Sequence, residues 1–446
     1  MTLTENQWLG APPFHSAIDA TSTEPHVFTL VDDGAASLAA RLELIEGAEQ
    51  SIDLEFFIYE LDTASRIVTQ ALAEKSRSGV DVRVLVDFSL AVFELRPAFA
   101  RVLSEAGVEV RYYNTSSVAR IFSVQHRTHR KMLIVDNNVA MVGGRNIADD
   151  YFDLGGHYNF LDSDVIVEGE LVPTMRESFD LYWDSDWSID PEAVASETPE
   201  DDALASGFLT PNPSDVETRA RVMGLAGESS QHTCNHTRFV TDYPGAGVQY
   251  RKVYQAILET LGSAESAVLA ESPYFVLRDD GLDDVAGLTE RGIDLTVLTN
   301  SLHSTDAYYT VAPLYFSLDT LAKTKLDLFA YSGERPNDLP PAFPASDRWG
   351  VHSKRAVVDD HTIMIGTYNI DPRSANLNSE LMIVCRGNTE LAAEMRRDIE
   401  SRISRSHHVV DAGQVENSEL IGEAPLSSIA LMVVITPVAS MFDFLL

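Results

Sequence analysis

The sequence predicts an α/β protein built from two similar halves. One motif, H-x-K-x4-D-x6-G-x-x-N, stands at residues 129–146 and again, with identical spacing, at residues 352–369. Another stretch, GVDVRVLVDFS at 79–89, has a counterpart in GIDLTVLTNSL at 292–302. Within each half, helical patterns alternate with runs of β-branched residues, which is typical of helices layered on a sheet.

Each half is expected to run helix, strand, helix, strand, strand and then the motif. A helical pattern opens each half, AASLAARLELIEG in the first and RKVYQAILETLGS in the second. The strand segments that follow are expected at 48–62, 79–89 and 110–114 in the first half, and at 264–277, 292–302 and 326–331 in the second.

The boundary between the halves is expected near residue 225. The segment 188–217 is rich in Pro, Ser and acidic residues, which predicts a linker or an irregular excursion. This divides the chain into an N-terminal half of residues 1–225 and a C-terminal half of residues 226–446. The apolar segment from residue 429 to the end predicts either a surface-lying membrane anchor or a last element packed against the core.

Composition limits the partners and the compartment. The chain has 446 residues, 45% of them hydrophobic, and a formal net charge of −35, so most of its surface would repel nucleic acid. Cys234 and Cys385 are the two cysteines and predict neither a disulfide framework nor a metal site. The first residues lack a secretory pattern, which predicts a cytoplasmic location or a peripheral one on the cytoplasmic membrane face.

Each motif is expected to form a β-hairpin. Alternate residues of a strand share one face, so His129 and Lys131 point the same way, as do His352 and Lys354. Asp136 and Asp359 are expected in the turns, because Asp and Asn side chains bond to nearby backbone. The returning strand then brings the motif's Gly and Asn back beside the His and Lys.

Two such hairpins face to face would surround one tetrahedral anion with two His, two Lys and two Asn. This set suits a phosphodiester and needs neither a metal nor another cofactor. One neutral His attacks phosphorus, and the other, protonated, donates a proton to the leaving alcohol. The lysines and amides stabilise the developing charge on the phosphoryl oxygens. One copy of the motif would be a weak signal, but two copies in matching halves are a strong one.

At these residues the sequence resembles the phospholipase D superfamily, over roughly residues 35–405. The stretches that carry the resemblance are RTHRKMLIVD, GGRNIADDYFD, ESPYF, LTNSL and NIDPRSANLNSEL, and together they are similar to the bacterial cardiolipin-synthase-like branch. The resemblance implies two α/β/α sandwich halves related by a pseudo-twofold axis. Each half would have a mixed, mostly parallel sheet, and one active site would lie between them.

The resemblance also implies roles for the motif residues in phosphatidyl transfer. His129 would be the nucleophile, and His352 the general acid and then the base. The phosphate would be bound by Lys131, Lys354, Asn146 and Asn369.

An acidic residue downstream of each motif is implied as the partner that orients a histidine. Asp162 takes that place in the first half and Glu380 in the second, with Asp164 as an alternative to Asp162. A carboxylate that accepts from one ring nitrogen fixes the tautomer and supports the imidazolium.

Further residues are expected at the substrate: Gly144, Thr367, Tyr274 and Arg127. Tyr274 and Phe275 would line an acyl or headgroup entrance or be ordinary core aromatics. Arg127 and Arg145 would either add positive charge for an anionic phospholipid or be structural.

The predicted partners are a phospholipid at a membrane surface and an alcohol acceptor or water. The phospholipid would be phosphatidylglycerol, phosphatidylethanolamine or cardiolipin. Three alternatives stay open: a phospholipase D that yields phosphatidic acid, a nuclease-type phosphodiesterase and a non-catalytic lipid-binding protein. The acidic balance weighs against the nuclease, and the intact His and Lys weigh against the non-catalytic protein.

Overall fold

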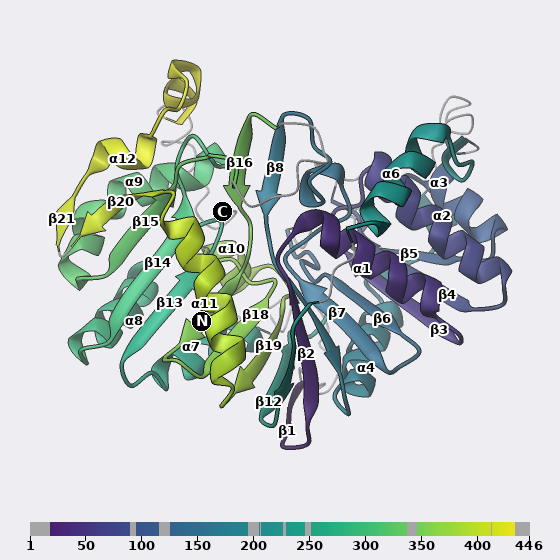
Figure 1. The fold of residues 1–446 in the computed structure, drawn as a ribbon, viewed down its shortest axis with the longest axis horizontal. Helices are drawn as coiled ribbons and strands as arrows, with labels where there is room; N and C mark the ends of the chain where they lie inside the picture. Colours follow the sequence, from purple (N-terminus) through teal and green to yellow (C-terminus); the bar gives the residue numbers. More distant parts are fainter. Residues whose placement is uncertain are drawn as a thin grey trace, which may run out of the picture.

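Two large sheets lie next to each other, each with helices on its outer side (Figure 1). The computed structural model describes residues 18–89, 95–115, 125–194, 205, 207–225, 229–245, 251–336, 346–411 and 413–432. The predicted α/β class is confirmed, and the sheets are mixed, as predicted.

The first sheet has nine strands in the order β10-β5-β4-β3-β6-β7-β9-β2-β11. The elements from the start of the chain to the end of β11 are β1 (Asp19–Ser22), β2 (His26–Val31), α1 (Gly34–Gly47), β3 (Ser51–Phe56), α2 (Thr63–Arg77), β4 (Asp81–Asp87), α3 (Pro97–Glu105), β5 (Glu109–Tyr113), β6 (Met132–Val135), β7 (Val139–Gly143), β8 (Tyr158–Leu161), β9 (Asp164–Glu168), α4 (Val172–Trp183), β10 (Ser188–Ile189), α6 (Pro213–Met223) and β11 (Gln231–Cys234).

The second sheet has ten strands in the order β1-β12-β19-β18-β17-β13-β14-β15-β20-β21. The remaining elements are β12 (Thr237–Thr241), α7 (Lys252–Gly262), β13 (Ala267–Glu271), α8 (Asp279–Glu290), β14 (Asp294–Asn300), α9 (Tyr308–Leu321), β15 (Asp327–Tyr331), β16 (Arg348–Val351), β17 (Arg355–Val358), β18 (Thr362–Gly366), α10 (Pro372–Asn376), β19 (Leu381–Arg386), α11 (Thr389–Ile403), β20 (Ser406–Asp411), β21 (Gln414–Val415) and α12 (Asn417–Ile421).

The two sheets repeat one topology. The order β5-β4-β3-β6-β7-β9 in the first matches β15-β14-β13-β17-β18-β19 in the second. Both the parallel pairs and the antiparallel pairs fall at corresponding places. The repeat seen in the sequence is therefore a repeat of the fold.

The expectation of mostly parallel sheets is wrong. In the first sheet, only β3–β4 and β4–β5 are parallel, and in the second only β13–β14 and β14–β15 are. A parallel pair needs a crossover, which α2, α3, α8 and α9 supply, whereas each motif is a short hairpin and a hairpin pairs antiparallel. The motif strands and their neighbours thus make antiparallel pairs the majority.

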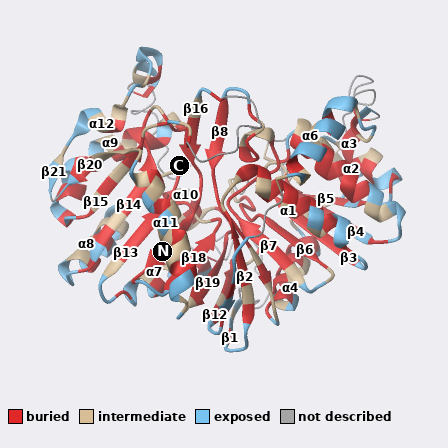
Figure 2. Ribbon diagram, viewed as in Figure 1, coloured by how far each residue is buried: buried red, intermediate tan, exposed pale blue. Residues whose placement is uncertain are grey.

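Buried side chains form three layers of core. One cluster lies under α1, α2 and α3, and a second lies under α7, α8 and α9. The third contains residues of both sheets together with α4 and α11, so the two halves share it. Figure 2 shows the sheet strands as largely buried, with exposed residues on the outer helices.

The halves exchange a strand at their seam. The strand β1, which precedes β2 of the first sheet, pairs with β12 of the second. The equivalent strand β11, which precedes β12, pairs with β2. The boundary near residue 225 stays a prediction, and strands from either side of it cross to the other sheet.

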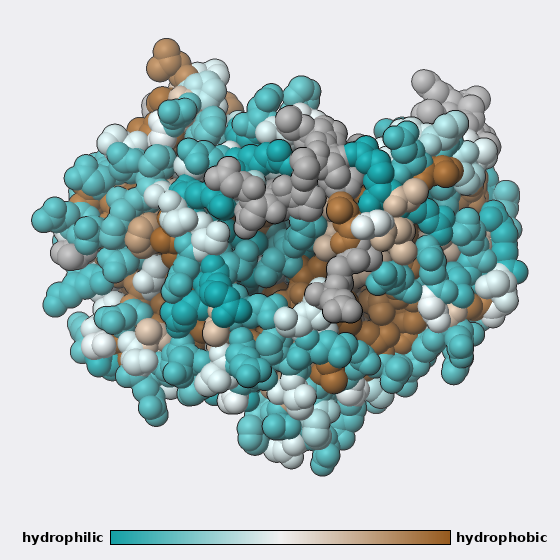
Figure 3. All heavy atoms as spheres, in the orientation of Figure 1, coloured by the Kyte–Doolittle hydropathy of each residue, from teal (hydrophilic) through white to brown (hydrophobic). Residues whose placement is uncertain are grey.

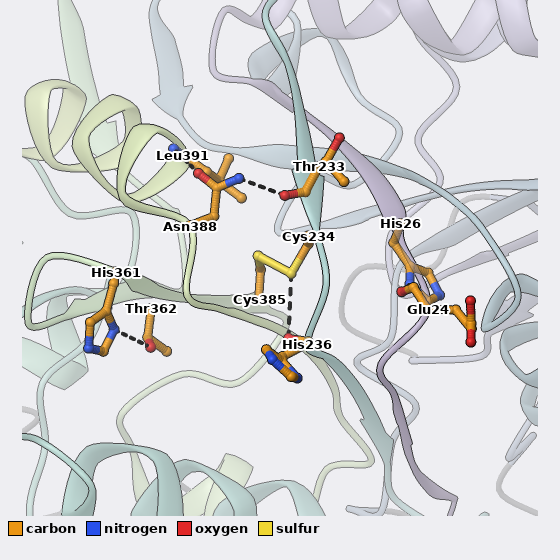
Figure 4. Close-up of a disulfide and its surroundings, with 10 residues drawn as sticks. All are labelled: Glu24, His26, Thr233, Cys234, His236, His361, Thr362, Cys385, Asn388 and Leu391. Carbon is orange, nitrogen blue, oxygen red and sulfur yellow. Dashed lines mark hydrogen bonds between the residues drawn. A yellow bond between two sulfur atoms is a disulfide. The ribbon is translucent and has the colours of Figure 1, made fainter.

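A disulfide closes the same seam. Cys234 in β11 is bonded to Cys385 in β19, with 5.8 Å between their Cα atoms (Figure 4). The expectation that the cysteines form no disulfide is wrong. They are 151 residues apart in sequence, and only the strand exchange brings them together.

Reduction of this disulfide should weaken the fold without removing it. Because the bond closes a long loop in the unfolded chain, we expect reduction to lower the free energy of unfolding by about 2–5 kcal/mol. Denaturant titration with and without reductant measures this. A Cys234→Ser, Cys385→Ser double variant is the control and should be insensitive to reductant. Equal unfolding midpoints for the oxidised and reduced wild type would show that the bond adds no stability.

The described residues include parts of the predicted linker and of the apolar tail. The segment 188–217 contains β10 and the start of α6, and residues 195–204 and 206 lie outside the described residues. Of the tail, residues 433–446 lie outside them too; Ile429 packs partly against the second core, Met432 is buried and Leu431 is exposed. Across the described ranges, none of the helices combines the length and the apolar character that a membrane crossing requires.

Candidate active site

The two motif hairpins are β6–β7 and β17–β18, and Asp136 and Asp359 hold their turns. Both residues have positive φ, 52° and 55°. The carboxylate of Asp136 accepts backbone N–H groups of Glu49, Gln50 and Ser51 at 2.6–2.9 Å. That of Asp359 accepts the corresponding groups of residues 265–267 at 2.8–3.2 Å. Each motif Asp therefore fixes its hairpin to the start of the neighbouring strand, β3 or β13, with which the hairpin pairs antiparallel.

Backbone bonds between the halves place the two histidines opposite each other. The N–H of His129 donates to the carbonyl of Ser379 at 2.9 Å, and the N–H of His352 donates to the carbonyl of Leu161 at 2.7 Å. The strand β16 ends directly before His352 and pairs in parallel with β8. Each histidine thus sits directly beside the residue that precedes the other half's acid.

Each histidine takes its carboxylate from the opposite half. Nδ1 of His352 lies 2.6 Å from Oδ2 of Asp162, and Nδ1 of His129 lies 3.1 Å from Oε2 of Glu380. The sequence analysis left open which histidine each acid serves, and the structure shows that the pairs cross between the halves. The parallel pairing across the interface is the reason, since it brings the segment before one acid alongside the segment before the other histidine.

Asp164, the alternative to Asp162, serves another group. It forms buried ion pairs with Arg41 at 3.1 Å and with Arg145 at 2.9 Å. The arginine Arg145 also donates to the carbonyl of Val31 at 3.0 Å. This network ties the start of β9 to α1 and to the loop after β7, and Asp162 is the carboxylate that reaches a histidine.

Gly144 and Thr367 occupy equivalent motif positions and both act on the acids. The carbonyl of Thr367 lies 3.0 Å from Nδ1 of His129, and its hydroxyl donates to Glu380 at 2.5 Å. At Gly144, an added Cβ would lie 2.2 Å from Oδ1 of Asp162. Both residues were expected at the substrate, whereas their contacts here position the His–acid pairs.

The two lysines are buried beside the histidines. Nζ of Lys131 donates to the carbonyl of His129 at 2.6 Å. Nζ of Lys354 lies 2.8 Å from Nδ1 and 3.1 Å from Nε2 of His352. Burial lowers the pKa of Lys354 to about 8, and burial together with Lys354 lowers the pKa of Lys131 well below its usual value.

The two asparagines differ in their contacts. Asn146 donates to the hydroxyl of Tyr151 at 2.9 Å and accepts the N–H of Ile58 at 3.1 Å. Oδ1 of Asn369 is buried and has no hydrogen-bond partner within the described part of the chain. Asn369 therefore retains unused polar capacity at the site.

Burial and the lysines favour the neutral form of both imidazoles. They lower the pKa of His352 to about 3 and that of His129 well below its usual value. The acids differ: burial raises the pKa of Glu380 to about 7. For Asp162, His352 and Lys354 outweigh burial and hold the pKa below its usual range. The pair His352–Asp162 is thus the better support for an imidazolium.

Three other expected residues have internal partners. Arg127 is buried and donates to the carbonyls of Phe88 and Asn114, each at 2.9 Å, beside Asp87. The expectation that Arg127 and Arg145 present positive charge to a lipid is wrong, because both guanidinium groups are buried and engaged with the protein. The hydroxyl of Tyr274 donates to Asp306 at 3.1 Å.

Aromatic contacts around the histidines were not predicted. Tyr151 and Phe160 lie against the ring of His352, with centroid distances of 5.1 and 4.7 Å. Phe57 lies edge-on to His129 at 5.2 Å. Tyr151 and Phe160 follow the first motif closely, so their position between that motif and Asp162 was the available signal.

One group of side chains in the described ranges has the spacing of a metal site. Asp327, His408 and Asp411 bring ligand atoms within 4.8 Å of one another. Asp327 begins β15, at the end of the sheet away from His352. This group is separate from the histidine pair and plays no part in its geometry.

Comparison with known proteins identifies the family. The family described as cardiolipin synthase, PLD-like domain, matches residues 42–183 and 257–403. Cardiolipin synthase C of Escherichia coli (strain K12) is 26% identical over 400 residues, covering 82% of each chain. An uncharacterised protein of Helicobacter pylori (strain ATCC 700392 / 26695) is 26% identical over 417 residues, 85% of this chain and 80% of that one.

A solved structure supports the same fold. The crystal structure of phosphatidylserine synthase from Haemophilus influenzae Rd KW20 superposes with a TM-score of 0.68. The match covers 94% of this chain and 95% of that chain, at 15% sequence identity. With two matched regions that each contain one His-Lys hairpin, the chain belongs to the PLD-like cardiolipin synthase family and is an enzyme of the phospholipase D superfamily.

Proposed function

We propose that this enzyme transfers phosphatidyl groups between lipid alcohols, without a metal, through a phosphohistidine on His129. The observation that carries the proposal is the crossed arrangement of two buried histidines, each backed by a carboxylate of the other half, with two buried lysines beside them. Relatives that are named cardiolipin synthases support a phospholipid as the substrate.

In the first step, Nε2 of His129 attacks phosphorus of the donor phospholipid. Glu380 and the carbonyl of Thr367 hold Nδ1, which leaves Nε2 as the nucleophilic nitrogen. The N–P bond forms, the bond from phosphorus to the headgroup oxygen breaks, and His352 gives its proton to that oxygen. Asp162 supports the imidazolium of His352.

In the second step, the acceptor alcohol replaces the headgroup. His352, now neutral, takes the proton of the acceptor hydroxyl as its oxygen attacks phosphorus, and the bond to His129 breaks. Lys131, Lys354 and the Asn146 and Asn369 amides bind the phosphoryl oxygens through both steps. The anionic substrate offsets the two lysines, so its binding raises the pKa of His352 toward the value that a general acid needs.

The substrate is proposed to be phosphatidylglycerol, phosphatidylethanolamine or cardiolipin, met at a membrane surface. The face seen in Figure 3 is mostly hydrophilic, with hydrophobic residues gathered in a recess right of centre. Nucleic acid is disfavoured by the net charge of −35. The cytoplasmic location stays a prediction, and the disulfide Cys234–Cys385 weighs against it because disulfides are rare in reducing compartments.

A lipid assay tests the proposal. Purified protein is mixed with liposomes of phosphatidylglycerol and phosphatidylethanolamine, with and without glycerol, and the products are read by mass spectrometry. We expect cardiolipin or a new phosphatidyl alcohol that is absent with His129→Ala and with His352→Ala. Phosphatidic acid as the sole product would make the enzyme a hydrolase, and no lipid product at any salt concentration would refute the lipid substrate.

The pH dependence of kcat/KM should reflect the ionisation of Lys354. With a pKa of about 8, this lysine is charged below pH 8 and loses its proton above it. Since the charged form binds the phosphate, kcat/KM should fall about tenfold per pH unit above pH 8. The corresponding fall in kcat should occur at higher pH, because the bound phosphate stabilises the protonated form of Lys354. The exposed Lys323, replaced by Met, is the control, and a flat profile through pH 10 would contradict the role of Lys354.

A further inference from the structure

A cavity of about 840 Å³ lies between the second sheet and its outer helices. Its floor is made by outward residues of neighbouring strands, among them Val268, Val297 and Met364. Leu261 of α7 and Leu288 of α8 contribute to its walls. The volume is within the range of ligand-binding pockets, about 300–1,000 Å³, and folded interiors seldom leave voids larger than a water molecule.

In the first half, buried apolar side chains of α1, α2 and α3 pack at the equivalent place. The register Ser51↔Asp81 matches Ala267↔Asp294, so residues of α2 and α8 can be paired by counting back from these strands. Gly281 stands where α2 has the fully buried Val68, and Asp284 stands where α2 has the buried Ala71. At the position of Gly281, the apolar side chain that closes the first half is therefore missing from α8, and at Asp284 an exposed carboxylate replaces a buried methyl group.

A third helix also closes the first half and has moved in the second. The helix α6 packs on α1 and α2, and Arg66 of α2 pairs with its Asp215 at 2.8 Å. In the second half, α12 packs on α9 and β20 instead. Two hydrogen bonds link α7 and α8 around the cavity: the hydroxyl of Tyr254 donates to Asp284 at 3.1 Å, and Arg291, just after α8, donates to the carbonyl of Gly262 at 3.0 Å.

One end of the cavity reaches the histidine site. Lys354 lines it, together with Phe275, Tyr368 and Ile370. Lys354 is the lysine in contact with the ring of His352. A ligand that occupied both places would need an anionic group at Lys354 and a long apolar part along the strands.

We propose that this cavity binds one acyl chain of the phospholipid whose phosphate lies between His129 and His352. The inference rests on the proposed function for the position of the phosphate. It adds a binding site for the acyl chain inside the protein, so part of the donor lipid leaves the bilayer during the reaction. Selectivity for chain length would then lie in α7, α8 and the sheet floor, away from the reacting atoms.

Photo-crosslinking tests the site directly. Wild-type protein is irradiated with phosphatidylglycerol that carries a diazirine at the end of one acyl chain, and adducts are mapped by mass spectrometry. We expect adducts on α7, α8, β13 and β14. Adducts confined to other elements would overturn the proposal. Stronger labelling of the cavity by a free diazirine fatty acid of equal length would do so too, because the chain would then bind without its headgroup.

Two variants narrow the cavity. Gly287 lines it, and an added Cβ there would meet no atom within 4 Å, so Gly287→Phe places a ring at the mouth with little displacement. Val285→Trp fills the interior. Val216→Trp, on the exposed side of α6, adds the same ring elsewhere and is the matched control. Thermal unfolding of each variant shows whether it is folded.

The readout is the ratio of kcat/KM for long-chain phosphatidylglycerol to kcat/KM for bis(4-nitrophenyl) phosphate, which has no acyl chain. We expect a fall of about tenfold or more in the two cavity variants, since excluding only a few methylene groups changes binding by that factor. An unchanged ratio in a folded Gly287→Phe would overturn the acyl site. Absence of turnover of both substrates by the wild type would instead refute the proposed function, and the crosslinks would still test the cavity.

Discussion

Replacing His352 by Asn should leave the enzyme with a single turnover on a nitrophenyl phosphodiester. Nitrophenolate departs without a proton, so His129 can still attack phosphorus when no general acid is present. The phosphohistidine then persists, because no base remains to activate water or an alcohol. We expect a burst of nitrophenolate equal to the enzyme concentration, followed by a steady rate lower by about 10⁴–10⁶, the size of effect found when a triad member is removed.

The covalent adduct itself is measured by mass spectrometry of peptides that contain residue 129. His129→Asn is the matched control and should show neither burst nor adduct. An adduct on residue 352 in the His129→Asn variant, with none on 129 in the His352→Asn variant, would reverse the two roles. Equal slow rates without any burst would contradict a covalent intermediate.

Asp162→Asn should lower kcat by about 10²–10⁴ through His352 and not through His129. Asp162 accepts from Nδ1 of His352 at 2.6 Å, so the amide would disturb the tautomer and remove the charge that supports the imidazolium. KM should change little, because Asp162 lies behind the ring and not at the phosphate. Steady-state kinetics with a phospholipid substrate measures both constants.

A double-mutant cycle distinguishes the crossed pairing from pairing within a half. Asp162→Asn combined with His352→Asn should cost little more than His352→Asn alone, since both act on one group. Combined with His352→Asn, Glu380→Gln should instead remove the remaining burst, because it disturbs His129. The reverse pattern would mean that each acid serves the histidine of its own half.

The spacing within a hairpin was predictable, and contacts between the halves were not. His129, Lys131 and Asn146 lie within one local unit whose turn chemistry and strand alternation decide which side chains share a face. The pairs His129–Glu380 and His352–Asp162 join residues 251 and 190 positions apart, and nothing local specifies them. Proximity in sequence would favour the opposite pairing, within each half.

The predictions of the strand directions and of the state of the two cysteines were wrong for related reasons. The strands β3, β4 and β5 were recognised from their β-branched runs, and their crossover helices make them parallel. Hydrophobic periodicity alone does not show that the motif strands and the strands next to them pair antiparallel. Cys234 and Cys385 lie in strands of different sheets. Their proximity depends on the strand exchange between the halves, which no sequence pattern predicts.

That exchange has a consequence for the order in which the chain is made. The strand β1 emerges among the first described residues, but its partner β12 follows more than two hundred residues later. At synthesis rates of about 5–20 residues per second, β1 therefore waits roughly 10–40 s with its backbone unpaired. Its short, polar sequence, DATS, is suited to that interval, because a long apolar strand held open for so long would recruit neighbouring chains on the same messenger.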